Sequence, residues 1–117
     1  MSRLLIVEDD VYIRESLVTV LEIEGHEVDC AGNGREALTQ IALRIPDAIL
    51  LDLMMPIMNG WEVLEALEGD SRWNSIPVLI LTASGAQIPV DSRRVRAVLR
   101  KPFQIQALLS AVQSALT

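Results

Sequence analysis

Short, uninterrupted aliphatic runs are the feature that most constrains how this chain can fold. Residues 4–7 (LLIV), 48–51 (AILL) and 78–81 (VLIL) are each entirely apolar. Such runs are too short for buried helices, and strands that are apolar on both faces must be covered on both faces. Longer stretches with apolar residues at helical spacing lie between them. This alternation predicts a doubly wound α/β fold, a parallel sheet with helices on both faces.

The same pattern predicts where the individual elements lie. Strands are expected at residues 4–7, 28–31, 48–51, 78–81 and 95–100, and helices at residues 13–21, 37–42, 63–67 and 105–116. The second strand is weaker because Glu27 and Asp29 alternate with apolar residues, which is typical of a sheet edge. The 117 residues are expected to form one domain, residues 1–117.

Composition excludes several classes of protein. The formal net charge is −6, which argues against direct binding of nucleic acid, and the basic residues 93–96 (RRVR) are interpreted as a solvated helix face. No apolar stretch approaches the roughly 18 residues that a membrane span needs. Cys30 is the only cysteine, so an intrachain disulfide is excluded and a cytoplasmic protein is expected.

Polar side chains follow four of the expected strands. They are Glu8, Asp9 and Asp10 after the first strand, Asp52 after the third, Thr82 after the fourth and Lys101 after the fifth. Open parallel sheets bind ligands beyond the carboxyl ends of their strands, where the ends of neighbouring strands meet. We therefore expect these side chains to converge on one edge of the sheet.

The chemistry of this set indicates phosphoryl transfer. Crowded carboxylates repel one another unless a cation lies among them, and Mg²⁺ prefers oxygen ligands of this kind. The ammonium of Lys101 is a point charge suited to a phosphoryl group, and the carboxylate of Asp52 could attack phosphorus to form an acyl phosphate. Taken singly, each acid has a plainer interpretation, with Asp52 as a turn residue and Asp10 as the cap of the first helix.

Four motifs give the chain a resemblance to the receiver domains of bacterial response regulators. They are LLIVEDD near the start, DLMMPIMNG in the middle, and ILTAS and LRKPF towards the end. The match runs over the whole chain, and the string D-x-x-M-P-x-M-N-G together with K-P-F is highly specific. The resemblance implies a flavodoxin-like, five-stranded sheet of order 2-1-3-4-5.

The resemblance also implies a role for each site residue. Asp52 would be the phosphorylated aspartate, Thr82 the switch hydroxyl, and Lys101 the lysine that pairs with the phosphoryl group. The ligands of Mg²⁺ would be Glu8 (through water), Asp9, Asp52 and the backbone carbonyl of Met54. The peptide bond between Lys101 and Pro102 is expected to be cis.

The function implied in this way is a phosphorylation-dependent signalling switch, without turnover of a separate substrate. A histidine kinase or a histidine phosphotransfer protein would donate the phosphoryl group, and a conformational change would then signal to an output protein that the sequence does not identify. No contact with nucleic acid or with a membrane is implied, and a homodimer is left open. The alternative is that this chain is a receiver domain taken from a larger DNA-binding regulator or hybrid kinase.

The sequence departs from the family pattern before the fifth strand. The stretch between Thr82 and Lys101 is a few residues short, and Gly85 and Pro89 disfavour a helix interior. The fourth helix is therefore expected to be short, displaced or absent. Val98 stands where the family often has an aromatic ring, so phosphorylation is expected to reorder residues 83–96 instead of rotating a side chain.

Two other functional classes deserve comparison. Residues 32–37 (GNGREA) fit the dinucleotide-binding pattern G-x-G-x-x-A, but they follow the second expected strand, and Glu8 and Asp9 would repel a pyrophosphate. An aspartate-based phosphatase would need Asp-x-Asp after the first strand, where position 8 is Glu. His26 is the only histidine and precedes the second strand, so the donor histidine is expected on another molecule.

Overall fold

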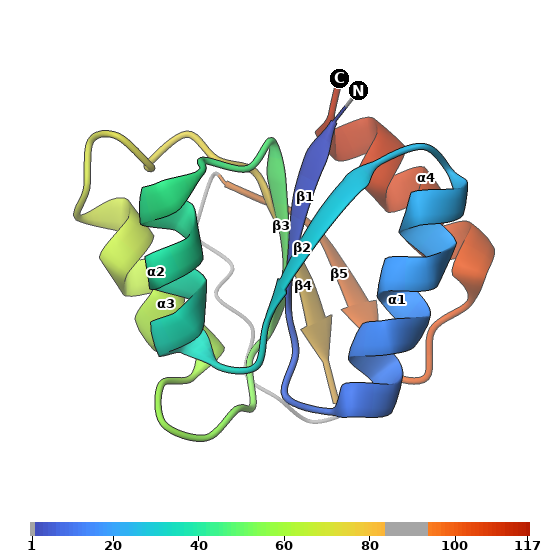
Figure 1. Ribbon diagram of the computed structural model, residues 1–117, viewed down its shortest axis with the longest axis horizontal. Helices are drawn as coiled ribbons and strands as arrows, with labels where there is room; N and C mark the ends of the chain where they lie inside the picture. The colour runs from blue at the N-terminus through green and yellow to red at the C-terminus, as the bar shows by residue number, and fades with distance from the viewer. Residues whose placement is uncertain (1, 84–93) are drawn as a thin grey trace.

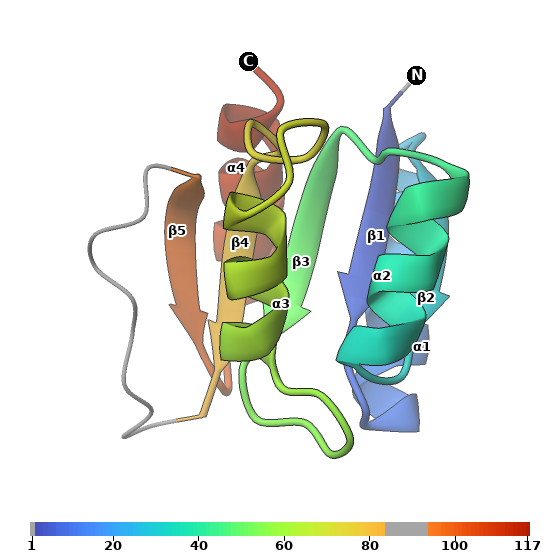
Figure 2. The same ribbon diagram turned by 90° about the vertical axis from the view of Figure 1, so that its left-hand side faces the viewer.

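Five parallel strands form one sheet at the centre of the molecule (Figures 1 and 2). A computed structural model of the chain describes residues 2–83 and 94–117. The strand order is β2-β1-β3-β4-β5, as predicted. The strands are β1 (Arg3–Val7), β2 (Glu27–Ala31), β3 (Ala48–Asp52), β4 (Val78–Thr82) and β5 (Val95–Arg100). All five predicted strands are confirmed, and β2 lies at an edge of the sheet.

Helices in the described part of the chain cover both faces of the sheet. α1 (Val11–Ile23) and α4 (Ile105–Ala115) lie on one face, and α2 (Gly34–Leu43) and α3 (Gly60–Glu68) lie on the other (Figure 1). The four predicted helices are confirmed. Three of them begin two or three residues earlier than predicted, because the prediction started each helix at the first residue of its apolar pattern.

Side chains of β1 alternate between two cores, one on each face of the sheet. Leu5 and Val7 pack on the side of α2 and α3, whereas Leu4 and Ile6 pack on the side of α1 and α4. All four side chains are buried. The continuous aliphatic run is therefore explained by a strand that has no face open to water, and its burial drives folding.

Polar caps fix where α1 and α3 begin beside the carboxyl edge of the sheet. Oδ1 of Asp10 accepts hydrogen bonds from the backbone N–H groups of Tyr12 at 2.9 Å and Ile13 at 3.1 Å. The predicted capping role of Asp10 is thus confirmed. Asn59 and Glu62 form a reciprocal capping box at the start of α3. These caps stabilise the loops that follow β1 and β3.

The interpretation of residues 93–96 as a solvated helix face is wrong for the part that the structure describes. Val95 and Arg96 belong to β5, and Arg94 is buried. The Arg94 guanidinium donates to the carboxylate of Glu68 and to the carbonyl of Trp73, each at 2.9 Å. The sequence pattern misled because these partners lie far from Arg94 along the chain.

The expected change in the fourth helix concerns residues 84–93, which lie outside the described residues. The expected reordering of residues 83–96 on phosphorylation falls largely on the same segment and stays a prediction. Val98 lies in β5 and packs against the core formed with α2 and α3.

Both ends of the chain lie at the same end of the sheet. Ser2 and Thr117 line one pocket there, opposite the edge where the strands end (Figures 1 and 2). Across the described residues, no helix combines the length and the apolar character that crossing a bilayer requires.

Candidate functional site

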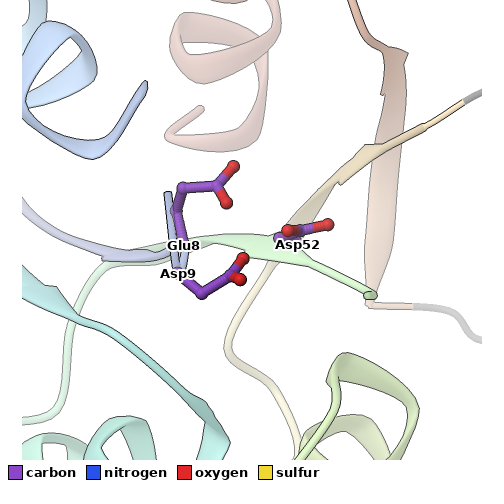
Figure 3. Close-up of side chains that lie close together, drawn as sticks. All are labelled: Glu8, Asp9 and Asp52. Atoms are coloured by element: carbon purple, nitrogen blue, oxygen red, sulfur yellow. The ribbon is translucent and has the colours of Figure 1, made fainter. Parts of the chain in front are cut away.

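Three carboxylates meet at the carboxyl edge of the sheet. Glu8 and Asp9 directly follow β1, and Asp52 is the last residue of the neighbouring strand β3. One oxygen from each carboxylate lies within 4.8 Å of one from each of the others. Figure 3 shows the three side chains gathered around one space. The register of β1 against β3 therefore brings these acids together.

Glu8 is fully buried, and all of its polar atoms have partners in the protein. Its backbone N–H donates to the carbonyl of Ala31 at 3.0 Å, and its own carbonyl accepts from Nη1 of Arg14 at 2.8 Å. Its Oε1 accepts from Nζ of Lys101 at 2.5 Å, and its Oε2 accepts from the backbone N–H of Asp10 at 3.2 Å. Glu8 is therefore held in place before any ligand binds.

The two aspartates differ from Glu8 and from each other. Asp9 is exposed, and its carboxylate makes no hydrogen bond or ion pair with any residue that the structure describes. Asp52 is only 3% exposed, and its Oδ1 accepts from the backbone N–H of Met54 at 3.2 Å. Asp9 is thus the acid that is most open to an arriving cation.

Lys101 brings a positive charge from the end of β5 to this cluster. Its Nζ lies 2.5 Å from Oε1 of Glu8 and 3.4 Å from Oδ2 of Asp52. The peptide bond between Lys101 and Pro102 is cis, as the resemblance implied. The ammonium therefore bridges the buried glutamate and the buried aspartate.

Thr82 lies next to this lysine at the end of β4. The backbone N–H of Lys101 donates to the carbonyl of Thr82 at 2.7 Å. The Thr82 hydroxyl is buried and donates to the carbonyl of Ala83 at 3.2 Å. The structure places Thr82 on the same edge as the acids, with its hydroxyl bonded to the chain that leaves β4.

Burial and charge act in opposite directions on the titratable groups. Burial raises the pKa of Glu8 from its usual 4.5 to about 7, although the hydrogen bonds from Lys101 and Asp10 act the other way. Burial acts to lower the pKa of Lys101, but the carboxylates of Glu8 and Asp52 outweigh it, so the pKa is raised. With all three acids ionised, one lysine leaves an excess of negative charge that attracts a cation.

Two glycines let the loop after β3 pack closely. A Cβ atom on Gly60 would lie 2.5 Å from the carbonyl oxygen of Asp52, and one on Gly34 would lie 2.7 Å from the carbonyl oxygen of Met58. Within the loop, Ile57 has a φ of +70°, and the N–H of Met58 bonds back across it at 2.7 Å in a strained γ-turn. The loop beside Asp52 is thus held tightly in an unusual conformation.

The donor set fits Mg²⁺. All donors are oxygens, as this ion prefers, and ligands on opposite sides of Mg²⁺ lie about 4 Å apart. The 4.8 Å spread of the three carboxylates is somewhat larger, so a small shift or a bridging water is needed. Glu8 is fully buried, and its Oε1 lies only 2.5 Å from the Lys101 ammonium, so a water between this acid and an ion fits best. Asp9 has no described partner and the contacts of Asp52 are longer, at 3.2 Å and 3.4 Å, so these two acids have the more available oxygens.

The glycine-rich turn and the histidine do not belong to this cluster. Asn33 caps α2, and the N–H of Gly34 donates to the loop after β3 at 2.9 Å, so the G-N-G sequence serves helix packing. His26 directly precedes β2 and therefore lies at the opposite end of the sheet.

Sequence reasoning missed Arg14, which bonds to the Glu8 carbonyl from the first turns of α1. The only available signal was its position four residues after the cap Asp10, one helical turn along the same face.

Comparison with known proteins points to one family. Residues 4–113 match the family described as response regulator receiver domain. Response regulator MprA of Mycolicibacterium vanbaalenii is 40% identical, over 97% of this chain and 50% of the relative. MprA of Mycobacterium tuberculosis is 39% identical with the same coverage. The chain thus spans about half the length of the curated relatives it matches.

Solved structures show the same fold. Chemotaxis response regulator CheY4 of Vibrio cholerae superposes with a TM-score of 0.86 at 31% identity, covering 99% of each chain. The signal receiver domain of a histidine kinase from Syntrophus aciditrophicus gives 0.87 at 33% identity, covering 99% of this chain and 90% of that one. The chain therefore belongs to the response regulator receiver domain family, whose members act as switches in two-component signalling.

Proposed function

We propose that Asp52 accepts a phosphoryl group in a reaction that depends on Mg²⁺. The observation that carries this proposal is the convergence of Glu8, Asp9 and Asp52 beside the ammonium of Lys101. Such a site suits a reaction in which negative charge develops on a phosphoryl group. Bound Mg²⁺ would supply charge neutralisation to the phosphoryl oxygens. Its ligands are proposed to be Asp9, Asp52, the Met54 carbonyl and, through water, Glu8.

Asp52 is the proposed nucleophile because its position is fixed and one oxygen is only weakly bonded. Its Oδ1 is held by the N–H of Met54 at 3.2 Å, whereas Oδ2 has only the distant Lys101 ammonium at 3.4 Å. A carboxylate oxygen of Asp52 forms a bond to phosphorus, and the bond from phosphorus to the donor imidazole nitrogen breaks. The electron pair leaves with that nitrogen, and the product is an acyl phosphate.

Lys101 and Thr82 would respond to the new group. The Lys101 ammonium, now bonded to Glu8, lies close enough to Asp52 to pair with a phosphoryl oxygen there. The Thr82 hydroxyl, now bonded to the Ala83 carbonyl, would turn to the phosphoryl group. That turn would release the chain after β4, and this rearrangement is the proposed signal.

The partners are proposed at the level of chemistry. Histidine kinases or histidine phosphotransfer proteins fit as donors, because the chain's only histidine lies away from the site. Residues 1–117 are proposed to act as one receiver unit. Since relatives such as MprA are about twice as long, the output of this unit could reside on the same polypeptide or on another.

The test uses acetyl phosphate as a small phosphodonor. Wild-type protein with Mg²⁺ should gain one phosphoryl group by intact mass, labile to acid and base, and a chelator should prevent it. Asp52→Asn should remove the uptake, whereas the matched control Asp47→Asn, an exposed aspartate elsewhere on the chain, should keep it. Equal uptake by the Asp52→Asn variant would refute Asp52 as the nucleophile.

A further inference from the structure

Arg14 holds the acidic residues Glu8, Asp9 and Asp10 at both ends. Its side-chain Nη1 donates to the carbonyl of Glu8 at 2.8 Å. Its backbone N–H donates to the carbonyl of Asp10 at 2.9 Å, as part of the first turn of α1. One residue of α1 therefore fixes the peptide group between Glu8 and Asp9 and the peptide group that follows Asp10.

This contact matters because, in the described structure, Asp9 is restrained through its backbone alone, by Arg14 on one side and by the bond from the Asp10 N–H to Glu8 on the other. The Asp9 carboxylate makes no hydrogen bond or ion pair there, and its side chain is exposed. Its direction into the cluster is therefore set by the backbone on which it stands. The carbonyl that Arg14 holds belongs to the peptide between Glu8 and Asp9, so rotation of that peptide would redirect the Asp9 side chain.

The guanidinium of Arg14 is itself placed by its surroundings. It is half-buried, and it packs over Gly32 in the turn before α2. A Cβ atom on Gly32 would lie 3.4 Å from Nη1 of Arg14 and 3.7 Å from Oε2 of Glu36, which are ordinary van der Waals distances. The guanidinium therefore lies against the turn at Gly32, beside the carboxylate of Glu36.

We infer that Arg14 is a positioning residue for the divalent cation, acting through the Glu8–Asp9 peptide. This inference rests on the proposed Mg²⁺ site. Groups that orient metal ligands from outside the coordination sphere typically change metal affinity about tenfold to a hundredfold when removed. The described hydrogen bond of the Arg14 side chain goes to a backbone carbonyl and not to a carboxylate of the site, so its loss should weaken metal binding more than it slows the reaction of the metal-loaded site.

The experiment is a calorimetric titration of the full chain with Mg²⁺. Arg14→Met keeps much of the apolar stem but removes every donor, and it should raise the Kd for Mg²⁺ by about tenfold to a hundredfold. Arg14→Gln, a milder change, should raise the Kd in the same direction. The matched control is Arg44→Met, which removes the same charge from an exposed position at the far end of α2 and should leave the Kd unchanged.

A kinetic readout separates positioning from a general structural role. With acetyl phosphate, Arg14→Met should need more Mg²⁺ for half-maximal phosphorylation but reach the wild-type plateau. A lower plateau at an unchanged midpoint would overturn the inference, as would a Kd within about twofold of wild type in either variant that circular dichroism shows to be folded. Absence of Mg²⁺ binding by the wild type would instead overturn the proposed function itself.

Discussion

Lys101 and Arg94 are two charged side chains in the described part of the chain whose surroundings differ. Lys101 lies in the acidic cluster, defined as Glu8, Asp9, Asp52 and Lys101, where three carboxylates face one ammonium. Arg94 lies in the arginine clamp, which it forms with the Glu68 carboxylate and the carbonyls of Leu67 and Trp73. The exposed fraction of the side chain is 21% for Lys101 and 1% for Arg94.

The difference shows how a charged site can be distinguished from a structural ion pair. The arginine clamp balances one guanidinium with one carboxylate and directs the remaining donors at backbone carbonyls, so its described contacts leave no excess charge. The acidic cluster has more negative than positive charge, and Asp9 is open to solvent. Excess charge beside an open ligand costs stability in the absence of a cation, and it prepares the site to bind one.

The largest expected effect on stability comes from breaking the arginine clamp. Arg94→Met should lower the free energy of unfolding by about 2–3 kcal/mol, because hydrogen bonds to charged groups contribute roughly 1.5–3 kcal/mol. Mg²⁺ affinity should stay close to wild type. Urea unfolding and metal titration measure both quantities. The control is Arg72→Met, whose arginine pairs with Asp70 on the surface and should matter little. An Arg94→Met variant as stable as wild type would contradict the structural role of the clamp.

Lys101→Arg tests the cation of the acidic cluster. A planar guanidinium does not reproduce an ammonium that lies 2.5 Å from Glu8 and 3.4 Å from Asp52. We expect Mg²⁺ binding to survive, while the rate of phosphorylation by acetyl phosphate falls on the order of tenfold to a hundredfold. Unchanged phosphorylation in this variant would show that any positive charge suffices there.

Neutralising one acid of the acidic cluster and the one acid of the arginine clamp should change the free energy of unfolding in opposite directions. Without metal, Asp52→Asn should raise the free energy of unfolding by about 1 kcal/mol, because it relieves repulsion among the carboxylates. Glu68→Gln should lower it by less than about 1 kcal/mol, since the Glu68 side chain is 55% exposed. Chemical denaturation with a chelator present measures the sign of the change in the free energy of unfolding for each substitution. Destabilisation by both substitutions would contradict the view that the acidic cluster carries excess negative charge and the arginine clamp does not.

The last expected effect concerns pH. The pKa of Glu8 is about 7 in the folded protein and about 4.5 when exposed. Between pH 4.5 and pH 7, Glu8 therefore keeps its proton in the folded state but loses it in the unfolded state. The contribution of Glu8 to stability is therefore fully present below pH 4.5 and is lost as the pH rises through 7. Glu8→Gln should flatten this dependence in metal-free denaturation curves.

For the same reason, Mg²⁺ should bind several-fold more tightly at pH 8 than at pH 6 in the wild type, because the cation requires ionised ligands. A Kd independent of pH would mean that Glu8 is already ionised at pH 6.

Much of the fold could be predicted because its signals are local. The aliphatic runs of β1, β3 and β4 determine both the strands and the places where they end. Since the site residues stand at those ends, their convergence follows from a parallel sheet alone. The cap Asp10 is likewise encoded within a few residues of the helix that it starts.

The parts that could not be predicted depend on contacts between distant segments. Arg94 belongs to a basic run, and nothing near it in sequence shows that its partners are Glu68 and Trp73 in another layer. The raised pKa of Glu8 depends on complete burial, which only the packed structure reveals. Arg14 is one polar residue of an amphipathic helix until its bond to the loop after β1 is known.

The shared position of Ser2 and Thr117 has a consequence for how this unit can be joined to other chains. Both residues line one pocket, while the acidic cluster lies beyond the opposite ends of the strands. A strand of about five residues spans roughly 17 Å. A linker attached at either terminus is therefore separated from Asp52 by about the length of one strand. The receiver can therefore be appended to, or inserted into, a longer polypeptide with its acidic edge left clear for a phosphodonor.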